Sequence, residues 1–254
     1  MIKVLVNGAL GRMGRTVCAA VTADEQLELV AAVDIVSGTV EGLSVETNLD
    51  AALKKFQPDV MVDFTRPAAV FANVMTALEN KVSPVVGTTG LSDDDKQKIR
   101  DACEVNQTPA FIAPNFALGA VLMMLTARKI AKYMPDVEII ELHHDKKLDA
   151  PSGTAELTAK MISEVRLKHK QGHPDEVERL EHVRGADVDG IRIHSVRLPG
   201  FVAHQEVIFG GLGQTLTIRH DSTGRDSFMP GVVLACKKVR ALKGLTIGLD
   251  KILD

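Results

Sequence analysis

The fold class is determined by Ile2-Lys3-Val4-Leu5-Val6-Asn7-Gly8-Ala9-Leu10-Gly11-Arg12-Met13-Gly14, near the start of the chain. Its apolar and β-branched residues up to Val6 predict a short strand, and the apolar spacing from Arg12 to Ala23 predicts a helix. Glycines between a strand and a helix let the backbone approach a pyrophosphate, and the helix start offers free N–H groups. The stretch therefore indicates a dinucleotide-binding unit. A tight turn needed only for packing is the alternative.

Asp34 strengthens the nucleotide interpretation because it follows the second predicted strand, Leu27 to Val33. An acid about 20 residues beyond such a turn accepts hydrogen bonds from the ribose of an adenine nucleotide. The predicted cofactor contacts here are Gly8, Gly11, Arg12, Met13, Gly14 and Asp34. Because Ile35 after Asp34 carries no cation, charge favours NADH. Arg12 is close enough in sequence to meet the 2′-phosphate of NADPH, so use of both cofactors stays open.

Further short strands alternate with helical patterns through the first half of the chain. They are expected at Val60 to Phe64, Val82 to Val86 and Ala110 to Ile112. Pro67 suits a first helical turn, and Ser92-Asp93-Asp94-Asp95 resembles a helix capping box. This alternation predicts an α/β domain with a Rossmann-like, doubly wound parallel sheet, assigned to residues 1–116.

The second half has a different period. Ile191 to Arg197, His204 to Phe209 and Gln214 to Arg219 alternate apolar and polar residues between glycine-containing turns, which predicts an antiparallel sheet. With a strand at Val137 to Leu142 and a helix beginning near Thr154, residues 117–224 are expected to form an α+β domain with an open mixed sheet. The polar segment 168–181 is expected to be a surface loop, and the helical pattern of 225–254 predicts a tail that packs back on the first domain.

Composition excludes several classes of protein. The 254 residues carry a net charge of −3, which does not fit a nucleic-acid-binding surface and favours a small-molecule partner. No N-terminal signal pattern is present, and no apolar run approaches the roughly 20 residues that cross a bilayer. Cys18, Cys103 and Cys236 are too far apart to indicate a disulfide framework or a zinc site. We expect a cytoplasmic protein without a membrane, nucleic-acid or metal partner.

Two more turns are expected at the carboxyl edge of the parallel sheet, where such sheets bind ligands. Gly87-Thr88-Thr89-Gly90 follows the fourth strand, and Ala113-Pro114-Asn115-Phe116 follows the fifth. The predicted nicotinamide contacts are Gly87, Thr88, Thr89, Ala113, Asn115 and Phe116. A plain turn before the Ser92 cap is the alternative for the first segment, and a helix cap is the alternative for Asn115.

The most informative segment for chemistry is Glu138-Ile139-Ile140-Glu141-Leu142-His143-His144-Asp145-Lys146-Lys147-Leu148-Asp149-Ala150-Pro151-Ser152-Gly153-Thr154-Ala155. A strand ends at two histidines followed by two lysines, and a Pro-Ser-Gly-Thr sequence leads into a helix whose N–H groups can hold a carboxylate. Paired histidines more often reflect packing, and paired lysines are usually solvated. Their presence beside an anion-binding helix start favours a catalytic site. The other histidines of this half, at 169, 173 and 182, lack compact zinc-ligand spacing.

This segment closely resembles the signature of the dihydrodipicolinate reductase family. The glycine-rich turns and Asp63-Phe64-Thr65-Arg66-Pro67 share in the resemblance, which spans nearly the whole chain. It implies a homotetramer whose core is the open sheet, here Gly190 to His220. It also implies NADH and/or NADPH as cofactor and a cyclic imine dicarboxylate as substrate. The implied reaction converts 4-hydroxy-tetrahydrodipicolinate into tetrahydrodipicolinate and water, in lysine and diaminopimelate biosynthesis.

The resemblance also implies a role for each matching residue. His143 matches the general acid, and a histidine with an ordinary pKa of about 6.5 is a reasonable proton donor near neutrality. Lys147 matches the lysine that assists protonation and holds substrate charge, and His144 matches a substrate-binding histidine. The carboxylate site is matched by Ser152, Gly153 and Thr154. Two alternatives remain: another two-domain Rossmann dehydrogenase, which lacks this motif, and a nucleotide-sensing binding protein, which has no need of a proton donor.

Overall fold

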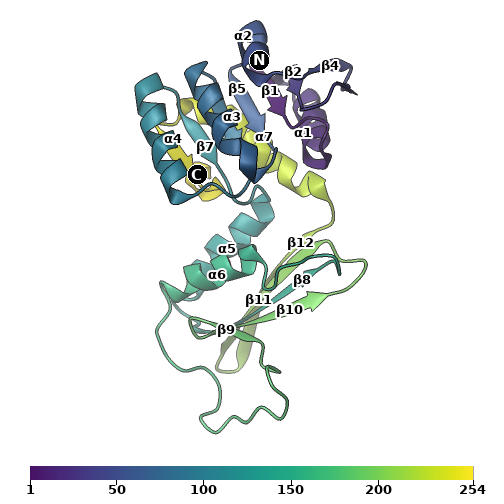
Figure 1. Ribbon diagram of the computed structural model, residues 1–254. Helices are drawn as coiled ribbons and strands as arrows, with labels where there is room; N and C mark the ends of the chain where they lie inside the picture. The colour runs from purple at the N-terminus through teal and green to yellow at the C-terminus, as the bar shows by residue number, and fades with distance from the viewer. Residues whose placement is uncertain (254) are drawn as a thin grey trace. The chain divides into compact units, whose positions relative to one another are not determined.

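The computed structural model describes Met1 to Leu253 and divides into two compact units. The first unit comprises Met1–Leu118 and the C-terminal segment from Arg225, and the second comprises Gly119–Gly224 (Figure 1). Each unit has its own sheet and its own helices.

The first unit is built on an eight-stranded sheet with the order β13-β7-β6-β5-β1-β2-β4-β3. The strands are β1 (Ile2–Asn7), β2 (Leu27–Val33), β3 (Thr39–Val40), β4 (Leu43–Glu46), β5 (Val60–Asp63), β6 (Ser83–Val86), β7 (Ala110–Ile112) and β13 (Leu245–Ile247). Every neighbouring pair is parallel except the short β3–β4 hairpin. The predicted Rossmann-like parallel sheet is confirmed. Because β2 and β5 flank β1 on opposite sides, the strand order reverses at β1, which is where such sheets bind ligands.

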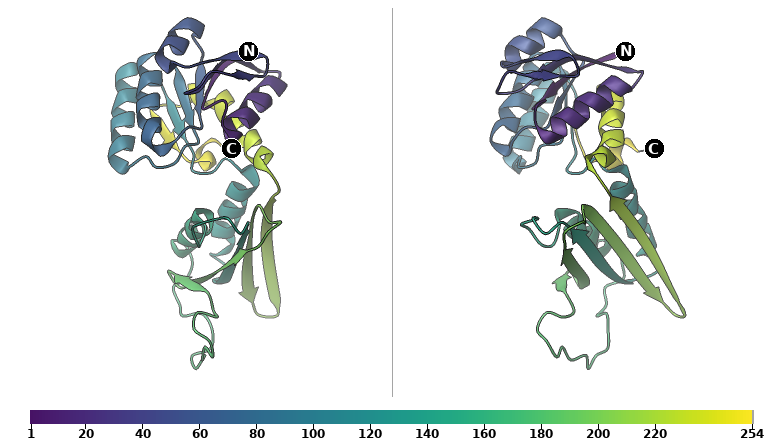
Figure 2. Two further views of the ribbon diagram at one scale, coloured as in Figure 1. Left: turned by 45° about the vertical axis from the view of Figure 1, so that its right-hand side comes forward. Right: turned by 90° about the vertical axis from the view of Figure 1, so that its right-hand side faces the viewer.

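Helices cover both faces of this sheet. They are α1 (Arg12–Ala23), α2 (Leu49–Phe56), α3 (Pro67–Glu79), α4 (Asp93–Asn106) and α7 (Met229–Lys238). The helices α2, α3 and α4 lie on one face, and α1 and α7 lie together on the other (Figures 1 and 2). Lys237 of α7 forms an ion pair of 2.7 Å with Asp24 at the end of α1. Pro67 begins α3, and Ser92 and Asp95 form the predicted capping box of α4.

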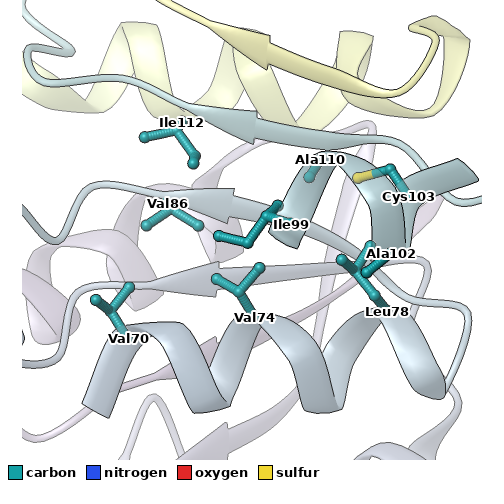
Figure 3. Packing of buried hydrophobic residues seen from close by; sticks show 9 residues of the cluster. All are labelled: Val70, Val74, Leu78, Val86, Ile99, Ala102, Cys103, Ala110 and Ile112. Carbon is teal, nitrogen blue, oxygen red and sulfur yellow. The ribbon is translucent and has the colours of Figure 1, made fainter. Parts of the chain in front are cut away.

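The core of the first unit is apolar and closely packed. One cluster fills the space between α3, α4 and the strands β6 and β7 (Figure 3); its buried members are Val70, Val74, Leu78, Val86, Ile99, Ala102, Cys103, Ala110 and Ile112. All three cysteines are buried and unpaired. Burial raises the pKa of the Cys103 thiol to about 11 and those of Cys18 and Cys236 to about 12. These thiols are therefore packing residues and not reactive groups.

The second unit contains a five-stranded mixed sheet with the order β12-β11-β8-β10-β9. The strands are β8 (Asp136–His143), β9 (Ala186–Val188), β10 (Ile191–Arg197), β11 (Ala203–Gly211) and β12 (Gln214–Ser222). The expected open mixed sheet is confirmed, but the expectation that the last three segments pair with one another as an antiparallel sheet is wrong for β10. The central strand β8 lies between β10 and β11, parallel to β10 and antiparallel to β11. The crossover through a helix after β8 makes this parallel pairing feasible.

Helices α5 (Leu118–Ile130) and α6 (Gly153–Ser163) lie on one face of this sheet (Figures 1 and 2). Burial alternates along β8: Val137, Ile139 and Glu141 are buried, whereas the residues between them are partly exposed. The other face of the sheet therefore stays open in the single chain. The segment 168–181 forms no helix or strand and is largely exposed, as expected for a surface loop.

Candidate active site

The glycine-rich turn between β1 and α1 has room for backbone only. Gly8 has a φ of +80°, and a Cβ there would lie 2.7 Å from the carbonyl oxygen of Phe64. A Cβ at Gly14 would lie 2.0 Å from the carbonyl oxygen of Gly8. Gly11 precedes the first turn of α1 and supplies no side-chain cap. The first N–H groups of α1 are thus uncovered by a capping side chain and fit a phosphate group.

Asp34 is bonded to this turn. One of its carboxylate oxygens accepts a hydrogen bond of 2.9 Å from the amide of Leu10, and the other accepts one of 2.7 Å from the amide of Ile35. Each carboxylate oxygen has a further lone pair, so the group can still accept a bond from a ribose hydroxyl. Asp34 therefore both holds the turn and offers acceptors beside it. Arg12 is exposed at the start of α1.

A buried carboxylate, Asp63, organises the carboxyl edge of the sheet. It ends β5 and accepts hydrogen bonds from four side chains: Asn7 at 3.0 Å, Asn73 at 2.9 Å, Thr65 at 2.8 Å and Thr88 at 2.8 Å. Among the predicted nicotinamide contacts, Thr88 is therefore buried with its hydroxyl directed to Asp63. Sequence reasoning singled out the segment that contains Asp63 but gave this residue no role.

The neighbouring turns differ in what they expose. Thr89 is exposed, whereas a Cβ at Gly87 would lie 2.1 Å from the ring of Phe64. Ala113 and Phe116 are buried, and the Phe116 ring packs 5.9 Å from that of Phe64, measured between centroids. Asn115 accepts a hydrogen bond of 2.9 Å from the amide of Ala117, the residue before α5.

In the second unit, β8 ends in a closely connected polar cluster. Glu141 is fully buried, and one of its oxygens lies 2.5 Å from Nδ1 of His143. Arg197, at the end of β10, donates to both carboxylate oxygens, at 2.8 and 2.7 Å. The parallel register places Arg197 opposite His143. Because Glu141 and His143 are two residues apart on a strand, their side chains lie on the same face of the sheet.

The predicted carboxylate-binding segment begins beside this cluster. The amide of Ser152 donates to Glu141 at 3.2 Å, and the Ser152 hydroxyl accepts from the amide of Ala155 as the cap of α6. A Cβ at Gly153 would meet no heavy atom within 4 Å. The first turn of α6 is therefore anchored through Ser152 and open at Gly153. Thr154 follows in the same turn.

Lys147 is held close to this segment. Its Nζ lies 2.8 Å from both carboxylate oxygens of Asp149, and its amide donates to the carbonyl of His144. The hydrogen bond from Lys147 keeps the pKa of Asp149 below its usual range. His144 is exposed. His143, Lys147 and the Ser152–Thr154 turn are thus connected to one another through Glu141, Arg197 and Asp149.

The electrostatics of His143 differ from the sequence expectation. Burial lowers the pKa of His143, and the nearby charges of Lys147 and Arg197 lower it further, while Glu141 raises it in part. Burial opposes ionisation of Glu141, but hydrogen bonds from Arg197 and His143 outweigh it, and the pKa of Glu141 is held below its usual range. The assumption of an ordinary pKa for His143 is therefore corrected: without substrate, its pKa lies below the ordinary value.

Sequence reasoning missed Glu141 and Arg197 as members of this site. The alternation along β8 contained the signal for Glu141. No local sequence pattern indicated Arg197, because its position in the site depends on how β10 pairs with β8.

Among the described residues, no group of three or more His, Cys, Asp or Glu side chains is arranged to hold a metal ion. None of the helices in that part of the chain has the length and apolar character needed to span a bilayer.

Comparison with known proteins agrees with this geometry. Residues 2–116 match the family model described as dihydrodipicolinate reductase, N-terminus, and residues 119–253 match the corresponding C-terminal model. The 4-hydroxy-tetrahydrodipicolinate reductase of Listeria welshimeri is 53% identical over 263 residues, covering 100% of both chains. That of Desulfitobacterium hafniense is 52% identical, covering 100% of this chain and 99% of the relative. The dipicolinate-bound dihydrodipicolinate reductase of Paenisporosarcina sp. TG-14 has 49% identity and a TM-score of 0.93, with both chains fully covered. The chain belongs to the dihydrodipicolinate reductase family.

Proposed function

We propose that this chain reduces 4-hydroxy-tetrahydrodipicolinate with NADH or NADPH, as the names of its relatives indicate for them. The observation that carries the proposal is the cluster at the end of β8, where a half-buried histidine, a lysine and an open helix start lie together. In this arrangement a cyclic imine dicarboxylate meets both anion donors and a proton donor. Residues 1–116 would bind the dinucleotide, and residues 117–224 would bind the substrate.

The first unit fits a dinucleotide. The crowded backbone of Gly8 and Gly14 and the uncapped start of α1 fit a pyrophosphate, and Asp34 provides the acceptors for a ribose. When bound, the cofactor supplies the hydride. The remaining predicted contacts, at Thr89 and the 113–116 segment, would orient the nicotinamide ring.

Substrate binding uses the charges around β8. One carboxylate is held by the first turn of α6 at Ser152, Gly153 and Thr154, where N–H groups and the helix dipole favour an anion. Lys147 exchanges the carboxylate of Asp149 for a carboxylate of the substrate, and His144 adds a donor from the exposed side. This exchange costs little because Asp149 is exposed and becomes solvated when it is released.

The proton comes from His143. Its Nδ1 faces Glu141, so Nε2 is the nitrogen that can hold the transferable proton. The pKa of His143 is lowered without substrate, and the negative charge of an arriving dianion raises it, which favours a proton on Nε2. The hydroxyl group of the substrate leaves as water together with a ring hydrogen, which gives a conjugated ring. Hydride addition to this ring builds electron density, which His143 neutralises by donating its proton to the ring, while the positive charge of Lys147 lies beside it.

A coupled assay tests the activity. Dihydrodipicolinate synthase generates the substrate, and oxidation of NADH or NADPH is followed by absorbance. Wild-type protein should oxidise at least one cofactor, and His143→Gln should lower kcat by roughly 10² to 10⁴ with a smaller change in KM. Absence of oxidation with either cofactor would reject the function. A variant with wild-type kcat would instead reject only the role of His143.

The open face of the five-stranded sheet supports a homotetramer. Ile140, Leu142, Val196 and Ile208 are only partly buried there in the single chain. Apolar side chains on a sheet face are usually covered, and copies of the same chain can cover them. Light scattering should give four times the chain mass of 27.4 kDa, and a monomer at micromolar concentration would contradict this assembly.

A cytoplasmic location accords with the three unpaired cysteines.

A further inference from the structure

We propose that the Glu141–Arg197 ion pair is a positioning device that fixes the tautomer of His143 and anchors the carboxylate-binding start of α6. This inference rests on the proposed role of His143 as proton donor. In this proposal, Glu141 and Arg197 contact neither the substrate nor the cofactor. They act through His143 and through the backbone of the 149–152 segment.

The tautomer follows from the donors around Glu141. Arg197 donates to both carboxylate oxygens, and the amide of Ser152 donates to one of them. A buried carboxyl with this set of donors is held as the anion and can only accept from His143. The Nδ1 atom of His143 therefore carries a hydrogen directed at Glu141. Nε2 is therefore the atom that takes up a proton and donates it during the reaction.

The pair also balances the proton affinity of His143. Three charged groups act on its imidazole: Glu141 from the same strand, Arg197 from β10, and Lys147 from the following loop. Glu141 favours the protonated ring, whereas both cations disfavour it. Loss of Arg197 would raise the proton affinity of the Glu141–His143 pair, and loss of Glu141 would lower the proton affinity of His143.

Arg197 and Glu141 connect this acid to the anion site. The Nη2 atom of Arg197 donates to the carbonyl oxygen of Asp149 at 2.9 Å, three residues before the helix cap. Glu141 accepts from the amide of Ser152, which is the cap itself. The same ion pair thus holds the loop that carries Lys147 and the turn that receives a carboxylate. A shift of the pair would misplace the acid and the anion site together.

A second charged group on β8 provides a matched control. Glu138 forms ion pairs with Arg184 and, at 2.8 Å, with His194, so it also joins an arginine and a histidine. It lies three residues from Glu141 and therefore on the opposite face of the strand. Both of these partners lie outside the segment from 143 to 154. Glu138→Gln changes charge as Glu141→Gln does, but away from His143.

The test compares pH profiles of kcat/KM with the pKa of His143, measured by NMR on protein labelled at the histidine Cε1. The His143 signal is assigned by its loss in His143→Gln. Glu141→Gln should lower the pKa of His143 and move the high-pH decline of kcat/KM to lower pH by ~1 unit, because an ionised neighbour is lost. Activity near neutrality should then fall about tenfold and recover toward acid pH. Glu138→Gln should leave the pKa of His143 at the wild-type value.

Arg197→Gln tests the opposite sign and remains informative if Glu141→Gln fails to fold. Removal of the cation should raise the proton affinity of the Glu141–His143 pair and move the decline of kcat/KM to higher pH. Loss of activity by the same factor at every pH, with no displacement of the decline, would mean that the pair is only structural and would overturn the proposal. So would an unchanged His143 pKa in both variants. The NMR measurement needs no turnover, so failure of the proposed reaction is distinguishable from failure of this inference.

Discussion

Gly153→Ala separates the stability of α6 from its use as an anion site. Gly153 is the first residue of the helix, its φ lies outside the left-handed region, and an added Cβ would meet no heavy atom within 4 Å. Replacing glycine by alanine at such a position stabilises a protein by about 0.4–1 kcal/mol, because the unfolded chain loses freedom. For a chain of this size, that corresponds to a rise in Tm of roughly 1–4 °C.

Binding should move in the other direction. A carboxylate that accepts from N–H groups lies about 2.7–2.9 Å from them, so a methyl group at the same turn competes for the space. We expect the Kd for pyridine-2,6-dicarboxylate to rise about tenfold, equivalent to about 1.4 kcal/mol. Calorimetric titration measures this change, and NADH binding should stay normal. The control Glu156→Gln alters the same turn without adding atoms near Gly153, and its dicarboxylate affinity should not fall. Wild-type dicarboxylate affinity in Gly153→Ala would place the anion site elsewhere.

Three more results are expected. Gly14→Ala places a Cβ 2.0 Å from the carbonyl oxygen of Gly8. Thermal unfolding should therefore show a free energy of unfolding that is lower by roughly 1–3 kcal/mol, and fluorescence titration should show a loss of NADH binding. Wild-type values for both would contradict this crowding. Asp34→Ala should raise the ratio of NADPH to NADH affinity, because a carboxylate repels a 2′-phosphate, and a wild-type protein with clearly tighter NADPH binding would reject this charge argument. Binding of pyridine-2,6-dicarboxylate should take up a proton, because the pKa of His143 is below its ordinary value without ligand and rises beside an anion. The affinity should therefore weaken as pH increases between these two pKa values, and calorimetry in buffers of different ionisation enthalpy that detected no uptake would contradict it.

The parallel sheet was predictable because its strands are continuous apolar runs. The predicted Leu27 to Val33 strand and the Arg12 to Ala23 helix have the observed bounds. The strand β13 was missed, since three residues give no period and its partner β7 lies far away in sequence. The hairpin β3–β4 and helix α2 were missed for a similar reason: each is short, and each is stabilised by packing that a local pattern does not contain.

The active site was predictable in its residue types but not in its connections. The motif from Glu138 to Ala155 indicated an acid, a cation and an anion-binding helix start. The role of Arg197 depends on the parallel pairing of β10 with β8, which the alternating pattern of β10 could not distinguish from antiparallel pairing. The pKa of His143 was assigned its ordinary value because sequence gives no measure of burial. Thr88 was expected to meet the cofactor, and only the fold shows its hydroxyl bonded to Asp63.

The Glu141–Arg197 ion pair lies on a face of β8 whose other buried residues are apolar. Buried ion pairs can often be replaced by apolar side chains without loss of stability, whereas removing one partner costs roughly 3–5 kcal/mol. Val137 and Ile139 already show that this face of β8 accepts apolar residues against the helices. A third apolar residue in place of Glu141 would continue the same core, but it would leave Nδ1 of His143, the amide of Ser152 and the guanidinium of Arg197 without their shared acceptor. The charge at this position therefore serves the acid and the anion site, which share it as an acceptor.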